Sequence, residues 1–241
     1  MKASDIFSNA LDWIYPPKCM ICREILIHGE EFSVCGECLE NLPFISGATC
    51  KICGEPSENE ICRYCEETAL PPFKRNYAVF VYNDDIRNVI HAFKYSNRPF
   101  FGKGLAGLMY EHSDKNIFKN TDYIVPVPIH KKRLRERGYN QAEILANEIS
   151  LKSGVSMIPD LLLRIKNTKP QNTLNIRERE MNTKDAFGFN KKYNLGCKKF
   201  LIIDDIHTTG NTLKECASLL KQNRAGEINC LTLSITVEKN S

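Results

Sequence analysis

Two adjacent carboxylates and a glycine-containing turn lie in the segment FLIIDDIHTTGNTL, residues 200–213. Four apolar residues lead directly into Asp204 and Asp205, and the polar turn 208–212 follows after two spacer residues. In an open parallel sheet, ligands bind where the carboxyl ends of strands meet the N-termini of helices. Amides and hydroxyls at a helix start suit a phosphate, and neighbouring carboxylates suit the two hydroxyls of a sugar diol. The segment therefore predicts a sugar-phosphate site.

The segment also suggests a role for each of its polar residues. Asp204 and Asp205 would accept hydrogen bonds from adjacent hydroxyls at the catalytic centre. Gly210 would let the backbone approach a phosphate closely. The structural alternative is a capped helix after a buried strand, but a cap needs one polar residue and not two carboxylates. The residues predicted to hold the phosphate are Thr208, Thr209, Gly210, Asn211 and Thr212.

Basic residues elsewhere in the chain could face the same ligand. The segment VPVP (125–128) follows a short apolar strand and leads into HKKRLRERGYNQ (130–141). A pyrophosphate leaving group with its magnesium ion would suit such a neighbourhood. The alternative for most cations of this segment is a solvated helix face, whereas 137–141 favours function because Gly138 permits close approach. The basic residues predicted to contact phosphates are Lys94, Arg133, Arg137 and Lys169.

Eight of the eleven cysteines form four C-x-x-C pairs between residues 19 and 65. Two such pairs complete one tetrahedral zinc site, so the segment predicts two sites with no open position for catalysis. Sequential and crossed pairings both fit the spacing. A redox pair and a disulfide scaffold are the alternatives, but four pairs argue against the first and a cytosolic setting against the second. The predicted ligands are Cys19, Cys22, Cys35, Cys38, Cys50, Cys53, Cys62 and Cys65.

The remaining elements alternate between strands and helices after an expected linker at 70–74. Strand patterns occupy 76–82, 123–129, 160–164, 199–203 and 228–237, and helical patterns occupy 84–95, 100–112, 136–154 and 210–224. A further short helix is expected at 4–15. This alternation predicts an α/β fold with a mostly parallel sheet flanked by helices. We therefore expect a zinc-binding domain over 1–70, which needs its metals to fold, and a sheet domain over 71–241.

Overall composition excludes several classes of protein. The 241 residues are 42% hydrophobic and 26% charged, as in ordinary globular proteins. The net charge of +4 offers no global electrostatic case for nucleic acid, so any basic surface must be local. The first residues do not read as a signal peptide and no stretch is apolar enough to span a membrane. A cytoplasmic protein is therefore expected.

Three motifs together resemble the ComF family, whose members combine a zinc ribbon with a type I phosphoribosyltransferase-like domain. They are the paired cysteine knuckles, RGYNQ after VPVP, and IIDDIHTTGNT near the C-terminus. The resemblance implies binding of magnesium-bound phosphoribosyl pyrophosphate and a role in uptake of single-stranded DNA. It also implies that Asp204 and Asp205 hold the ribose hydroxyls. Purine-salvage relatives place an acid where Thr208 stands, which speaks against a purine acceptor here; His207 is an alternative base.

Two functional hypotheses follow. In the first, the chain is an enzyme that transfers the phosphoribosyl group to an acceptor, mainly by positioning and charge stabilisation. In the second, it is a sensor of phosphoribosyl pyrophosphate or an adaptor that contacts single-stranded DNA and DNA-processing proteins through 130–137 and the zinc module. A purely regulatory ligand-binding domain is a third possibility, but no helix-turn-helix pattern supports it. The sequence identifies no acceptor.

Overall fold

The structure, a computed structural model, describes residues 16–26, 32–95, 98–167 and 185–237. The chain divides into two compact units, 1–42 and 43–241. The smaller unit contains the first four cysteines and the short helix α2 (Gly36–Glu40). The helix expected at 4–15 lies outside the described residues. Among the described residues, no helix has the length and apolar character needed to cross a bilayer.

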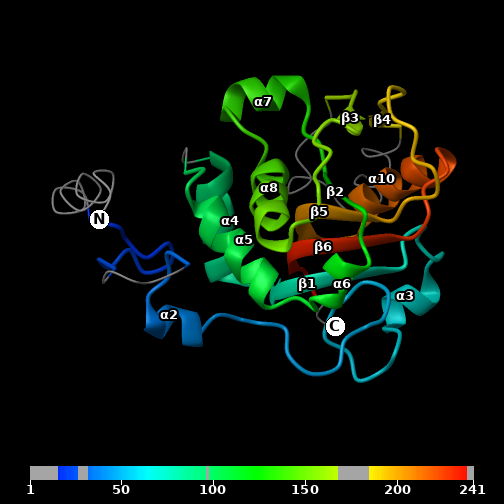
Figure 1. Ribbon diagram of the computed structural model, residues 1–241. Coiled ribbons are helices and arrows are strands. Elements are labelled where there is room, and N and C mark those ends of the chain that lie inside the picture. Colours follow the sequence, from blue (N-terminus) through cyan, green and yellow to red (C-terminus); the bar gives the residue numbers. More distant parts are fainter. Residues whose placement is uncertain (1–15, 27–31, 96–97, 168–184, 238–241) are drawn as a thin grey trace. The chain divides into compact units, whose positions relative to one another are not determined.

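A four-stranded sheet forms the centre of the larger unit (Figure 1). All three neighbouring pairs of strands run parallel. The strands are largely buried, as expected for a parallel sheet that is covered on both faces. The predicted fold class is therefore confirmed. In spatial order the strands are β1 (Arg75–Val81), β6 (Ile228–Ile235), β5 (Phe200–His207) and β2 (Tyr123–Pro126).

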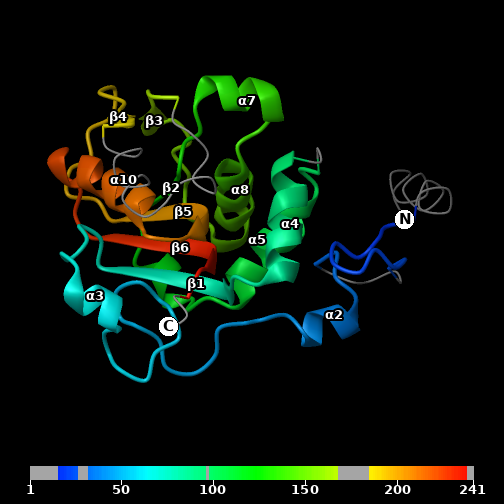
Figure 2. The same cartoon turned by 180° about the vertical axis from the view of Figure 1, so that it is seen from behind.

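Helices flank the sheet, with α4, α5 and α8 grouped away from α10 in both views (Figures 1 and 2). Helices α5 and α8 pack closely because α5 carries Gly102, where a Cβ atom would lie 2.2 Å from Cγ2 of Ile144. The helix ends match the predicted ones within a few residues, except around residue 138. The helices are α4 (Asp84–Tyr95), α5 (Phe101–Glu111), α6 (Asn116–Lys119), α8 (Gln141–Ser153) and α10 (Asn211–Gln222).

The helix predicted at 136–154 is confirmed as α8 over most of its length, but its predicted start is wrong, because a separate helix ends at residue 137. Helix α7 (Lys131–Arg137) ends at Gly138, whose φ of 82° is left-handed and whose N–H donates to the carbonyl of Leu134 at 2.8 Å. A left-handed glycine of this kind is a common helix stop. Helix α8 then begins afresh at Gln141. The connector places a bend beside the end of strand β2.

Two smaller elements complete the larger unit. Strands β3 (Leu162–Arg164) and β4 (Phe187–Phe189) form an antiparallel pair, and β4 packs against α10. Helix α3 (Arg63–Glu67) carries the last cysteine of the second group of four. The apolar core between the sheet and α10 includes Phe200, Leu213 and Leu220.

The second cysteine group covers the outer edge of the sheet at β1. The N–H of Asn76 donates to the carbonyl of Ile52 at 2.7 Å, and its side-chain amide donates to the carbonyl of Cys53 at 2.9 Å. Residue 54 must be glycine, because it has a φ of +81° and a Cβ there would lie 2.4 Å from the carbonyl oxygen of Asn76. The second cysteine group thus belongs to the same compact unit as the sheet, and the division between the two units lies at residues 42 and 43. The domain boundary predicted from the sequence lies at residue 70, where the cysteine-rich sequence ends.

Candidate active site

The two predicted carboxylates lie within strand β5, which extends beyond the predicted end at 203 to His207. The extension arises because Asp204 and His207 stay in register with Thr232 and Ile235 of strand β6. Both carboxylates line a cavity of about 460 Å³, within the usual size range of small-molecule sites. The carboxyl end of the central strand therefore forms part of the cavity wall.

Asp205 forms an ion pair with Lys94 of helix α4. The Nζ atom of Lys94 lies 2.6 Å from Oδ2 of Asp205, and the aspartate is only 9% exposed. A shielded pair of this kind is strongly affected by loss of one partner, because the other charge is then left dehydrated. The pair connects the C-terminal turn of α4 to the centre of the sheet and brings together two residues that the sequence assigned to one site.

Asp204 titrates far from its usual range. Burial raises its pKa from 3.8 to about 7, and the negative charge of Asp205 acts in the same direction. The N–H of Asp205, which donates to Oδ1 of Asp204 at 2.9 Å, and the charges of Lys94 and Arg164 oppose the rise. Near neutral pH the carboxyl group is therefore present in both protonation states. A carboxyl group with such a pKa in a cavity is typical of functional sites.

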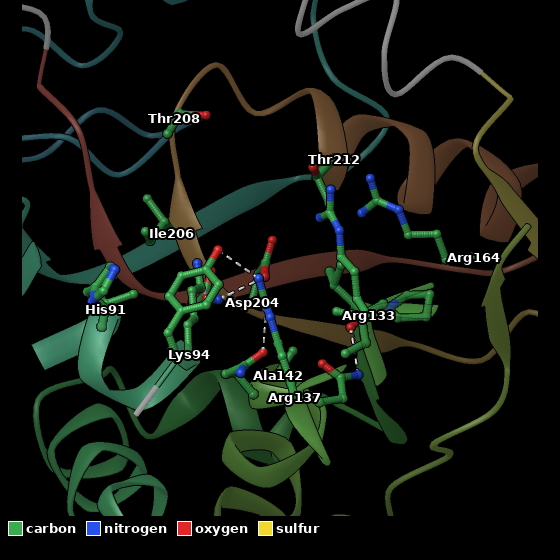
Figure 3. A pocket seen from close by; sticks show the side chains of 18 of the residues that line it. His91, Lys94, Arg133, Arg137, Ala142, Arg164, Asp204, Ile206, Thr208 and Thr212 are labelled. Carbon is green, nitrogen blue, oxygen red and sulfur yellow. Dashed lines mark hydrogen bonds and ion pairs between the residues drawn. The ribbon is translucent and has the colours of Figure 1, made fainter. Parts of the chain in front are cut away.

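The predicted phosphate loop connects β5 to the first turn of α10. Gly210 has a φ of +72°, and a Cβ there would lie 2.8 Å from Nε2 of His207. Thr208 and Thr212 line the cavity, on the loop and at the start of α10 respectively (Figure 3). Thr209, Gly210 and Asn211 are not among the lining residues. His207 is buried beneath the loop, where burial lowers its pKa to about 4, so it does not face the cavity as a base.

Five lysine and arginine side chains line the cavity together with the carboxylates, and Arg87 of α4 is one of them. Lys94 comes from α4, Arg133 and Arg137 from α7, and Arg164 from β3 (Figure 3). Burial lowers the pKa of the Arg133 guanidinium, and the charge of Arg137 adds to this effect. Concentrated positive charge in a sheltered cavity favours an anionic ligand. Lys169, the fourth basic residue predicted for this site, lies outside the described residues.

Arg137 is held by two neighbours. Its Nη1 donates to Oε1 of Gln141 at 3.1 Å, and its Nη2 donates to the hydroxyl of Tyr95 at 2.9 Å. The guanidinium also lies 4.7 Å from the centre of the Tyr95 ring. These contacts orient the side chain across the cavity wall between α4 and α8.

Arg164 is a cavity residue that sequence reasoning did not select. It is the last residue of β3, and its guanidinium lies 5.0 Å from the centre of the Phe187 ring on β4. Burial lowers its pKa, as does the charge of Arg133, whereas Asp204 opposes the shift. The sequence did contain a pattern that could have identified Arg164, because the apolar triplet 161–163 leads directly into this charged residue. The same pattern, an apolar strand followed by a charge, identified Asp204 on β5.

The eight paired cysteines form two groups with the sequential pairing. In each group the four sulfur atoms lie within 4.8 Å of one another, and both groups fit a zinc ion. The backbone N–H groups of Ile52 and Cys62 each donate to Sγ of Cys50 at 3.4 Å. Equivalent bonds reach Sγ of Cys19 in the first group. Such donors stabilise thiolate ligands, so the structure supports two zinc sites of four sulfurs each.

Comparison with known families agrees with this architecture. The phosphoribosyl transferase domain family matches residues 94–240. The chain belongs to this family. A second family, the double zinc ribbon domain, matches residues 10–69 of this chain. Among solved structures, adenine phosphoribosyltransferase from Saccharomyces cerevisiae is 16% identical, over 58% of this chain and 72% of that chain, with a TM-score of 0.38.

Relatives that match most of the chain confirm the resemblance to the ComF family. Competence protein F of Haemophilus influenzae is 28% identical, over 88% of this chain and 93% of its own length. DNA utilization protein YhgH of Escherichia coli is 28% identical, over 92% of this chain and 98% of its own. Competence protein ComFC of Bacillus subtilis is 27% identical, over 88% of each chain.

Proposed function

We propose that this phosphoribosyltransferase-family protein binds phosphoribosyl pyrophosphate together with magnesium and transfers the phosphoribosyl group to an acceptor. One observation carries the proposal: Asp204 and Asp205 lie side by side at the carboxyl end of β5, next to the glycine loop that opens helix α10. Five lysine and arginine side chains also line the cavity. One site thus combines carboxylates that can accept hydrogen bonds from a sugar diol, a loop that suits a phosphate, and cations that suit a diphosphate.

Each part of the donor has a matching part of the cavity. The two carboxylates would accept hydrogen bonds from the ribose hydroxyls. The 5-phosphate would lie at the 208–212 loop, where the first amides and the positive dipole end of α10 favour an anion. The diphosphate would lie toward Arg133 and Arg137 of α7. Lys94 would have to exchange its contact with Asp205 for one with the ligand, or share it.

The reaction would break the bond between C1 of the ribose and the diphosphate oxygen, whose electron pair leaves with the diphosphate. A nucleophilic atom of the acceptor would form the new bond to C1, and its proton would pass to solvent. Arg133 would stabilise the charge that develops on the leaving group.

Magnesium fits the residues that are present. Carboxylates and amide oxygens are the hard ligands that it prefers, directly or through water. The Oδ1 atom of Asn140, which lines the cavity, is buried without a hydrogen-bond donor among the described residues, and it suits a metal-bound water. When bound, the ion would neutralise charge on the leaving diphosphate.

The physiological role that we propose is in handling of single-stranded DNA during its uptake, in the cytoplasm. The names of the relatives support this role, since they include competence proteins and DNA utilization proteins. The acceptor of the phosphoribosyl group is not specified by this proposal.

A non-catalytic role as a sensor or DNA adaptor is the second candidate. Helix α7 exposes Lys131, Lys132 and Arg135, and the side chain of Tyr95 beside this helix is 52% exposed. Basic residues next to an exposed aromatic ring suit single-stranded nucleic acid, because bases stack on the ring while cations contact the backbone. The candidate predicts DNA binding that falls steeply as salt is raised, even without turnover.

Calorimetric titration with phosphoribosyl pyrophosphate and magnesium tests the first proposal. The double substitution Asp204→Asn/Asp205→Asn should weaken binding by roughly 3 kcal/mol, because two hydrogen bonds to charged acceptors are lost. The adjacent pair at the start of α4 offers a matched control, Asp84→Asn/Asp85→Asn, which lies outside the cavity lining. Failure of the folded, zinc-loaded wild type to bind the donor would refute the proposal and leave the adaptor role as the better account.

A further inference from the structure

Gln141 carries a buried hydrogen-bond donor beside the cavity. It is the first residue of α8, lines the cavity and is only 2% exposed. Its Oε1 accepts from Nη1 of Arg137 at 3.1 Å. A guanidinium can only donate, so this contact decides which end of the amide faces Arg137 and leaves Nε2 on the other side. Nε2 has no hydrogen-bond acceptor among the described residues.

Such a donor indicates a missing ligand atom. Buried amide donors in folded proteins are nearly always paired, because an unpaired one loses its bonds to water without replacement. Because Arg137 binds Oε1, the side-chain amide of Gln141 cannot turn over, and Nε2 stays in a position without an acceptor. This arrangement costs free energy unless a ligand accepts a hydrogen bond from Nε2. The surroundings then decide what kind of atom that ligand offers.

The surroundings of Nε2 favour an anion. Gln141 lies at the N-terminus of a helix of 13 residues, where the peptide dipoles present positive charge. The preceding residue, Asn140, does not cap the helix with its side chain, because its Nδ2 donates to the carbonyl of Val127 at 3.0 Å. The first-turn amides of α8 thus lack a side-chain cap. Arg133 and Lys94 line the same cavity.

We propose that Nε2 of Gln141, together with the first-turn amides of α8, contacts an oxygen of the diphosphate group of the donor. Arg137 is then a positioning residue that acts through Gln141, rather than a phosphate ligand. Its second contact, to the hydroxyl of Tyr95, keeps the guanidinium in place from the other side. This assignment rests on the proposed function and makes Gln141 the residue that selects a diphosphate ligand over a monophosphate.

The experiment measures binding of inorganic pyrophosphate and of ribose 5-phosphate, each with magnesium, by calorimetry. Gln141→Glu keeps the shape of the side chain and an oxygen for Arg137, but replaces the donor by a charged acceptor. It should weaken pyrophosphate at least about tenfold and change ribose 5-phosphate by less than about twofold. Gln222→Glu makes the same charge change at an exposed position of α10 and should change neither. Unfolding curves of Gln141→Met, which fills the same volume, verify that the site tolerates substitution.

A double-mutant cycle tests the role of Arg137. Arg137→Met should weaken pyrophosphate in the wild type but should have little further effect in the Gln141→Met background. An equal loss in both backgrounds would mean that Arg137 contacts the phosphate itself and would overturn the positioning role. Unchanged pyrophosphate binding by Gln141→Glu, with ribose 5-phosphate still bound, would overturn the assignment of Gln141 while the proposed function stands. A wild type that binds neither ligand would overturn both.

Discussion

Replacing Cys50 by serine is expected to destabilise the larger unit, whereas the same change at Cys19 is expected to spare it. The two cysteines occupy equivalent places in their groups, since each accepts two backbone hydrogen bonds at 3.4 Å. They differ in location, because the group of Cys50 belongs to the compact unit of the sheet, where it covers the edge at β1, and the group of Cys19 belongs to the smaller unit. Loss of a zinc ligand from the second group should therefore destabilise the sheet directly.

The contacts of Asn76 give the size of the effect. Its N–H bond to Ile52 and its side-chain bond to Cys53 both require that the second cysteine group is folded. Each bond contributes about 1 kcal/mol, and leaving the buried backbone N–H of Asn76 without its acceptor costs about 1–3 kcal/mol more. The side-chain amide keeps a second acceptor, Oγ1 of Thr232 at 3.2 Å. The expected loss is roughly 3–5 kcal/mol, a large part of the 5–15 kcal/mol that is typical of a folded domain.

Denaturant unfolding followed by far-ultraviolet circular dichroism would measure this difference. The wild type should bind about two zinc ions per chain, one at each four-sulfur site, and both variants should retain about one. The midpoint of the transition that reports the sheet should fall for Cys50→Ser and stay within error for Cys19→Ser. An equal fall in both variants, or none in either, would refute the reasoning from the contacts of Asn76.

Three further outcomes can be checked on the same protein. Because the folded pKa of Asp204 is raised from 3.8 to about 7, the folded state binds a proton more tightly than the unfolded state. The free energy of unfolding should therefore fall by about 3 kcal/mol as the pH rises from about 4 to about 7, and Asp204→Asn should remove that component. Gly210→Ala should cost about 1–3 kcal/mol of stability, because residue 210 has a φ of +72° and the added Cβ would contact His207. Thermal unfolding would measure the loss, with Gly196→Ala as the control, since Gly196 is also left-handed but has open space around it. Lys94→Met should leave Asp205 buried and unpaired, so thermal unfolding should show a stability loss of about 1–3 kcal/mol, in contrast to Lys103→Met on the neighbouring helix.

Much of the fold was predictable from local patterns. The alternation of apolar strands and amphipathic helices identified the parallel sheet, and the helix predicted at 84–95 agrees with α4. The acidic pair and glycine loop were predictable because a strand, two charges and a helix start stand in one unbroken order. The cysteine groups were predictable because ligand spacing follows directly from zinc geometry.

Other features depend on contacts between distant segments. The break at Gly138 was missed, because the residues on either side are good helix formers and only the left-handed glycine separates α7 from α8. The length of β5 was underestimated, since pairing with β6 carries two aspartates into the strand. Arg164 reaches the cavity only because β3 pairs with β4, some twenty residues later in the chain. The bond between Asn76 and Cys53 likewise joins segments that no local pattern connects.

The pairing of β1 with β6 also limits the order in which the chain can mature. Arg75 pairs with Asn229, so the first strand of the sheet finds its partner only after nearly the whole chain has left the ribosome. The second cysteine group is made much earlier, and its cluster includes Ile235 of β6. Metal capture, which needs only local sequence, can therefore precede closure of the sheet, and the loaded knuckle would keep the edge of β1 occupied while the C-terminal strand is synthesised. Zinc would then act in part as an internal chaperone for the nascent chain.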